Sequence, residues 1–124
     1  MISIVDDDAA IRDMLVSLVR SLGYDARSFA SAEEFLASDD LEKFACMIAD
    51  IHMPGMSGFE LKELLVERND PLPVIMITAR TEPDLQEKAI SRGAIGFLRK
   101  PFEVDTLVGF IEKALGSKAQ IQGS

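Results

Sequence analysis

Five polar residues stand where predicted β-strands end, and together they could carry out phosphoryl transfer. They are Asp6 and Asp7 after the first strand, Asp50 at the end of the third, Thr78 at the end of the fourth and Lys100 just past the fifth. Ligands of an open parallel sheet bind beyond the carboxyl ends of its strands, so these side chains are expected at one edge. Mutually repelling carboxylates need a compensating cation, and oxygen ligands favour Mg²⁺. The hydroxyl and the amine would then contact a second anion, and a phosphoryl group meets that need.

The strands that position these residues are predicted from short apolar, β-prone segments, at residues 2–5, 26–29, 46–49, 74–78 and 96–98. Between them lie amphipathic helical patterns, which cover residues 11–22, 31–36, 58–68, 83–92 and 104–115. Strict alternation of strand and helix implies a parallel sheet covered on both faces. The predicted fold is therefore a doubly wound α/β fold with five strands and five helices.

Local signals mark several helix ends. Ser31 and Glu34 have the spacing of a capping box, and Gly23, Gly93 and Gly116 stand where helices are expected to end. The helix over 83–92 has few apolar anchors, namely Leu85, Ala89 and Ile90, so we expect it to be weakly held. We expect one domain at residues 1–116, and a polar tail at residues 117–124 that is a frayed end, a linker stub or a cloning remnant.

Composition limits the function classes. The chain has 124 residues and a net charge of −8, which disfavours direct binding to nucleic acid or to acidic membranes. The longest apolar runs are far shorter than the roughly 18 residues that a membrane span needs. The start of the chain lacks the pattern of a secretory leader, and Cys46 is its only cysteine. These features predict a cytoplasmic protein that does not bind membranes.

Four motifs in order resemble those of the receiver domain of two-component response regulators. They are Ile4-Val5-Asp6-Asp7, the loop Asp50-x-x-Met-Pro-x-x-Ser-Gly, Ile77-Thr78-Ala79 and Lys100-Pro101. The resemblance covers Ile2 to about Leu115, and the loop and Phe97 look most like receivers of LuxR-type regulators. It implies a flavodoxin-like strand order 2-1-3-4-5 and a phosphorylation-dependent switch rather than an enzyme with a separate substrate.

The resemblance also implies roles for individual residues. Asp50 would be the phosphoacceptor, and Thr78 and Lys100 would contact the phosphoryl oxygens. Asp7 and Asp50 would bind Mg²⁺ directly, Asp6 would act through metal-bound water, and the backbone carbonyl of His52 would complete the protein ligands. Asp8 is left outside the site.

The switch and the partners follow from the same resemblance. Phe97 would be the switch aromatic together with Thr78, and the Lys100–Pro101 peptide bond is expected to be cis. His52 and Arg80 occupy positions that tune phosphoryl lifetime, although the His52 side chain is expected to be solvated. The expected partners are a histidine kinase or a histidine phosphotransfer protein, and a second copy of the chain could dock on the fourth helix, fifth strand and fifth helix.

Three other functions fit parts of the sequence. A small phosphatase of the haloacid-dehalogenase type would use Asp6 as nucleophile and Asp8 as acid, but Ala9-Ala10 replace its usual hydroxyl-bearing segment. An adaptor that is never phosphorylated would commonly lack an acid, the threonine or the lysine, and all of them are present here. A flavin-binding protein of the same fold would need a Ser/Thr/Gly phosphate loop after the first strand, and this sequence has none there. An effector domain beyond Ser124 and a stand-alone regulator both stay open.

Overall fold

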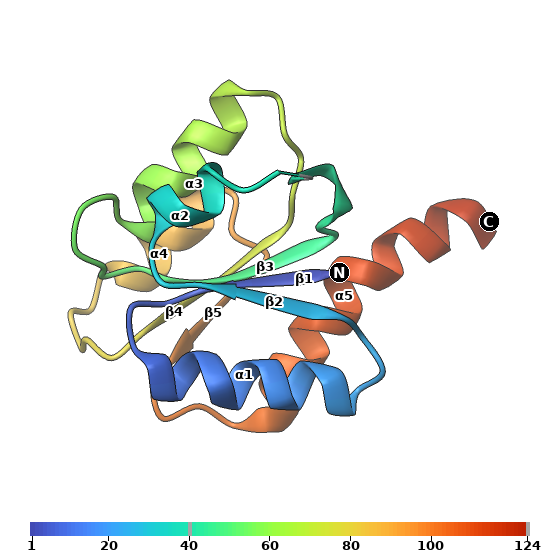
Figure 1. Ribbon diagram of the computed structural model, residues 1–124, viewed down its shortest axis with the longest axis horizontal. Coiled ribbons are helices and arrows are strands. Elements are labelled where there is room, and N and C mark those ends of the chain that lie inside the picture. Colours follow the sequence, from blue (N-terminus) through green and yellow to red (C-terminus); the bar gives the residue numbers. More distant parts are fainter. Residues whose placement is uncertain (40, 124) are drawn as a thin grey trace.

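The computed structural model describes residues 1–39 and 41–123, with the side chains of the last helix described as far as residue 116 (Figure 1). The elements in chain order are β1 (Ile2–Val5), α1 (Ala9–Ser21), β2 (Ala26–Phe29), α2 (Ala32–Leu36), a 3-10 turn η1 (Leu41–Lys43), β3 (Cys46–Asp50), α3 (Gly58–Glu67), β4 (Val74–Thr78), α4 (Leu85–Ser91), β5 (Gly96–Arg99) and α5 (Val104–Gly123). The five predicted strands are confirmed, and two of them extend one residue further than predicted. No helix in this part of the chain combines the length and the apolar character that crossing a lipid bilayer requires.

The strands form one parallel sheet in the order β2-β1-β3-β4-β5. This confirms the predicted doubly wound α/β fold and its strand order. Every residue of β1, β3 and β4 is buried, which explains why these strands are mostly apolar rather than alternating between apolar and polar residues.

Helices cover both faces of the sheet (Figure 1), with α1 and α5 on one side and α2, α3 and α4 on the other. Successive strand residues point to opposite faces, so each strand contributes to both layers. In β3, for example, Ile48 packs in the cluster with α1 and α5, whereas Met47 and Ala49 pack in the cluster with α2 and α3. The sheet therefore separates two apolar cores, and its carboxyl edge is left for polar groups.

Most predicted helix ends are confirmed, and one capping box was missed. Gly23 and Gly93 follow α1 and α4 with φ of +94° and +87°, the left-handed backbone that glycine adopts most easily. At α2 only half of the predicted box forms among the described residues, because the Ser31 hydroxyl accepts from the Glu34 amide without a recorded return bond. The complete box lies at α3, between Ser57 and Glu60.

The prediction that Gly116 ends the last helix is wrong, because α5 continues to Gly123. The backbone of Gly116 is not in the left-handed region, and nothing lies within 4 Å of where its β-carbon would be. Glycine lowers helix propensity by roughly 1 kcal/mol, which a packed helix tolerates, so its presence alone does not end a helix. The predicted tail at residues 117–124 overlaps α5, while its side chains and residue 124 lie outside the described part of the chain.

Helix α4 is the least anchored of the longer helices that cover the sheet. It spans seven residues, and only Leu85 and Ala89 are buried. Ile90, predicted as a third anchor, is 53% exposed because it lies about 100° around the helix from Ala89. The expected weak anchoring of this helix is confirmed, and it rests on even less apolar burial than predicted.

Gly58, the first residue of α3, packs directly on the end of β3. A β-carbon at this position would lie 2.5 Å from the carbonyl oxygen of Asp50 and 3.1 Å from the Cα of Ile51. Real β-carbons do not approach backbone atoms so closely, so the start of α3 and the end of β3 fit together only with glycine here.

We therefore expect Gly58→Ala to lower the free energy of unfolding by roughly 1–3 kcal/mol, because the backbone of β3 must shift to admit the methyl group. Gly109→Ala is the matched control, since Gly109 lies in α5 with nothing within 4 Å of its β-carbon position. That substitution should raise stability by up to about 1 kcal/mol. Urea unfolding followed by circular dichroism measures both, and equal effects would contradict the close contact.

Candidate functional site

The strand register sets the positions of the acidic residues. Val5 of β1 pairs with Ala49 of β3, so Asp6 and Asp50 follow at the same level of the sheet. Asp6 is fully buried and Asp50 is 6% exposed, whereas Asp7 is exposed. Two buried carboxylates thus lie side by side at the carboxyl edge, with a third at its solvent side.

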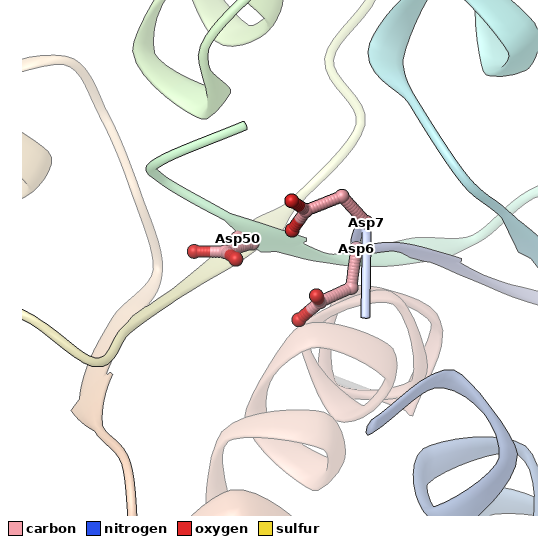
Figure 2. Close-up of side chains that lie close together, drawn as sticks. All are labelled: Asp6, Asp7 and Asp50. Atoms are coloured by element: carbon pink, nitrogen blue, oxygen red, sulfur yellow. The ribbon is translucent and has the colours of Figure 1, made fainter. Parts of the chain in front are cut away.

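The three carboxylates form one cluster, as Figure 2 shows at the ends of β1 and β3. Asp6, Asp7 and Asp50 each offer one oxygen, and these oxygens all lie within 4.8 Å of one another. The sequence prediction that these three acids converge agrees with this geometry. An all-oxygen cluster of this kind matches the ligands of a hard divalent cation.

Lys100 supplies the positive charge inside the cluster. Thr78 pairs with Arg99, so Lys100 follows at the same edge, where its Nζ lies 3.0 Å from Oδ2 of Asp6 and 3.5 Å from Oδ2 of Asp50. Burial opposes the charge on Lys100, but the hydrogen bond to Asp6 and the charges of both carboxylates outweigh it and raise its pKa. Lys100 therefore remains a cation and partly balances the two buried acids.

The surroundings of Asp50 disfavour the ionised form of its carboxylate. Burial, and then the charge of Asp6, raise its pKa from 3.8 to about 6, against the opposing effects of Lys100 and of the His52 amide. That amide donates to Oδ1 of Asp50 at 3.2 Å, and Lys100 approaches Oδ2. A strand-end carboxylate with a strongly shifted pKa beside a specific cation is a common feature of functional sites.

Asp8 is the N-cap of α1, unlike its neighbours Asp6 and Asp7. Its carboxylate accepts hydrogen bonds from the amides of Ala10 and Ile11 at 2.9 and 3.4 Å and so caps the N-terminus of α1. Its own amide donates to Oδ1 of Asp6 at 2.9 Å. Asp8 therefore holds Asp6 in place through the backbone while its carboxylate caps α1 and is not part of the cluster, in agreement with its exclusion from the predicted site.

Thr78 is fully buried, and its hydroxyl has two partners. The amide of Arg80 donates to Oγ1 at 3.0 Å, and Nδ1 of His52 lies 3.0 Å from the same oxygen. The expectation that the His52 ring is simply solvated is therefore wrong, since the ring is half-buried and reaches across from the β3–α3 loop to β4. Burial, and then the charge of Arg80, lower the pKa of His52, whereas Glu82 opposes this shift.

Phe97 is partly buried against the core on the side of α2, α3 and α4. Arg99 covers it, with the guanidinium carbon 5.1 Å from the ring centroid, and also donates to the carbonyl oxygen of Glu82 at 2.8 Å. Arg99 belongs to no sequence motif, so its contact with the β4–α4 loop was not predicted. The bond between Lys100 and Pro101 is cis.

An open cavity of about 450 Å³ adjoins the acidic cluster. Its lining residues are Asp7, Ile51, His52, Met53, Pro54, Ser57, Phe59 and Arg80. The cavity gives a small molecule or a partner side chain access to the edge of the sheet beside Asp7.

Comparison with known proteins agrees with this arrangement. Residues 2–112 match the family of the response regulator receiver domain. The chain belongs to this family. As a receiver domain of a two-component response regulator it is a phosphorylation switch rather than a catalytic enzyme, which confirms the resemblance seen in the sequence motifs and not the one to haloacid-dehalogenase-type phosphatases.

The receiver domain is similar to transcriptional regulatory protein FixJ of Bradyrhizobium diazoefficiens, with 38% identity over 92% of this chain and 56% of that protein. It is also similar to response regulator protein TmoT of Ectopseudomonas mendocina, with 41% identity over 93% of this chain and 52% of that protein. The solved structure of response regulator StyR matches with a TM-score of 0.88 and 38% identity over 98% of this chain and 62% of that one. The chain thus spans about half the length of FixJ and of TmoT.

The raised pKa of Asp50 predicts a pH-dependent cost to stability. Because folding raises this pKa from 3.8 to about 6, the folded protein binds the proton more tightly, and stability falls as pH rises through this interval. In metal-free buffer, Asp50→Asn should raise the free energy of unfolding at pH 7.5 by roughly 1–3 kcal/mol, with a smaller gain at pH 4.5.

Urea titrations at the two pH values measure this difference. Asp8→Asn is the matched control, because asparagine caps helices as well as aspartate does, and it should produce little change at either pH. A gain for Asp50→Asn that is equal at both pH values would contradict the assignment of the cost to the ionised carboxylate.

Proposed function

We propose that Asp50 accepts the phosphoryl group, from a phosphohistidine of a histidine kinase or a histidine phosphotransfer protein. One observation carries this assignment: Asp50 ends β3 beside Lys100, keeps some exposed surface where Asp6 has none, and is followed directly by Ile51 and His52, which line the open cavity. A carboxylate oxygen would attack phosphorus, the P–N bond would break, and the imidazole that leaves would take up a proton. The product on Asp50 is an acyl phosphate.

The acidic cluster fits Mg²⁺ as the cofactor. Three carboxylates within 4.8 Å are opposed by one lysine, so the cluster keeps an excess of negative charge for a divalent cation to balance. Asp7 and Asp50 would hold the ion directly, Asp6 through water, and His52 through its backbone carbonyl. When bound, Mg²⁺ would screen the charge of the incoming phosphoryl oxygens.

Thr78 and Lys100 would stabilise the phosphorylated state. The lysine already lies within reach of both buried acids, so it can turn to a phosphoryl oxygen on Asp50 without a large movement. The Thr78 hydroxyl would donate a second hydrogen bond to the same group. These contacts make Thr78 the link between the phosphoryl group and β4.

Phosphorylation is tested with a small phosphodonor such as phosphoramidate. With Mg²⁺, intact-mass spectrometry should show one added phosphoryl group, and both Asp50→Asn and chelation of Mg²⁺ should reduce labelling to background. Asp8→Asn should label normally, because Asp8 caps α1. Labelling that survives in Asp50→Asn and is lost in Asp6→Asn would instead support a phosphatase-like nucleophile, and unlabelled wild-type protein would support an adaptor.

We infer that the output surface consists of α4, β5 and α5, and that it can bind a partner protein or a second copy of the chain. Helix α4 buries only two side chains, and its preceding loop is held by Arg99 through the carbonyl of Glu82. A displacement of Thr78 toward a phosphoryl group would disturb that loop and open space for Phe97 to turn inward. The aromatic ring and Thr78 would then switch together.

Amide hydrogen exchange tests this switch. Saturation with Mg²⁺ and beryllium trifluoride, an analogue of the phosphoryl group, should change protection across residues 81–102 by severalfold. The strand β2 provides an internal control, because it is remote from α4 in the sheet order. Changes confined to the loops that carry the acids would contradict a switch through α4 and Phe97.

We also propose where the receiver domain ends, which kind of effector it controls and where in the cell it acts. We assign residues 1–116 to the receiver domain, supported by a family match that ends at residue 112 and by burial of Ala114. A similar protein is named as a transcriptional regulatory protein, which supports control of transcription. The resemblance of the loop and of Phe97 to receivers of LuxR-type regulators supports an effector of that type. The net charge of −8 makes contact with nucleic acid by this domain itself unfavourable. A cytoplasmic location suits the proposed kinase partner.

A further inference from the structure

The hydrogen bond between His52 and Thr78 joins the loop that follows β3 to the last residue of β4. Nδ1 of His52 lies 3.0 Å from Oγ1 of Thr78, and the ring reaches this hydroxyl from the loop that follows Asp50. The hydroxyl is fully buried, so water cannot replace this partner without a rearrangement. The contact therefore constrains the side chain that is proposed to bind the phosphoryl group.

The direction of this hydrogen bond follows from the other partner of Thr78. The Arg80 amide donates to Oγ1, so it cannot accept the hydroxyl proton. Among the described residues, Nδ1 of His52 is the other atom within hydrogen-bonding distance of Oγ1, so it is the acceptor available to the hydroxyl proton. A buried donor without an acceptor is costly. We therefore take the ring to be neutral, with its own proton on Nε2 and its Nδ1 accepting from Thr78.

We propose that His52 is a positioning residue that holds the Thr78 hydroxyl in the unphosphorylated protein and must release it before Thr78 can donate to a phosphoryl oxygen. This inference rests on the proposed function of Asp50 and Thr78. The hydroxyl has a single proton, so the ring and a phosphoryl oxygen compete for it. His52 thus favours the resting state through its side chain, while its backbone amide still binds Asp50.

The competition predicts tighter binding of a phosphoryl analogue when the acceptor is removed. Beryllium trifluoride with Mg²⁺ serves as the probe, and ¹⁹F NMR titration gives its affinity. His52→Leu should bind it roughly 2- to 10-fold more tightly than the wild type, the range expected for the loss of one competing hydrogen bond. His52→Asn, which keeps an acceptor near the position of Nδ1, should stay close to the wild type.

A double-mutant cycle separates this role from simple shielding of the site. Thr78→Val removes the hydroxyl with little change in shape, so in that background His52→Leu should alter the affinity by less than about twofold. An equal gain in both backgrounds, or no gain in the wild-type background, would overturn the inference and leave the proposed function intact. A wild-type protein that does not bind the analogue would overturn both.

The resting hydrogen bond can be observed without metal or analogue. His52 is the only histidine of the chain, so ¹⁵N-histidine labelling gives one unambiguous pair of ring nitrogens. At pH 8 we expect the proton on Nε2, and Thr78→Val should shift the Nδ1 resonance because its hydrogen bond is lost. A proton on Nδ1, or an Nδ1 resonance that ignores Thr78→Val, would overturn the inference.

Discussion

Three carboxylates meet at the carboxyl edge of the sheet, and the repulsion among them governs what surrounds them. Asp6 and Asp50 are buried side by side because the register of β1 and β3 leaves them no alternative. Lys100 balances part of this charge, but burial and then the charge of Asp6 still raise the pKa of Asp50. A cation bound at this cluster would relieve a repulsion that folding alone does not remove.

The layers and the strand-end acids were predictable because they depend on short-range patterns. A parallel sheet that is buried on both faces requires continuous apolar runs, and its topology brings the strand ends to one edge, so Asp50 could be recognised from its place after residues 46–49. The contact of His52 with Thr78 depends on side chains 26 residues apart, and no periodicity records it. The helix end predicted at Gly116 was wrong for another reason: glycine permits a helix to end but does not require it.

The helices differ in how firmly they are held on the sheet. Helix α1 buries two side chains, Leu15 and Val19, and also packs partly buried side chains against the same core, namely Ile11, Val16 and Leu18. Helix α4 buries two side chains as well, Leu85 and Ala89, but none of its seven residues adds a partly buried apolar side chain to either core. The helix with the least buried apolar surface is the easiest to displace, because less hydrophobic free energy opposes its movement. The asymmetry makes α4, rather than α1 or α5, the element whose position can depend on the state of the site.

The missing side chain at Gly58 has a mechanical consequence. The first residue of α3 packs on the carbonyl of Asp50 with no side chain between them, and its amide donates to the carbonyl oxygen of Ile51 at 2.9 Å, so any shift of α3 along β3 would disturb both contacts. If Asp50 is phosphorylated, we therefore expect the resulting displacement at β4 and the loop that follows it, rather than between β3 and α3. The missing β-carbon of one glycine would in this way decide which side of the sheet edge moves.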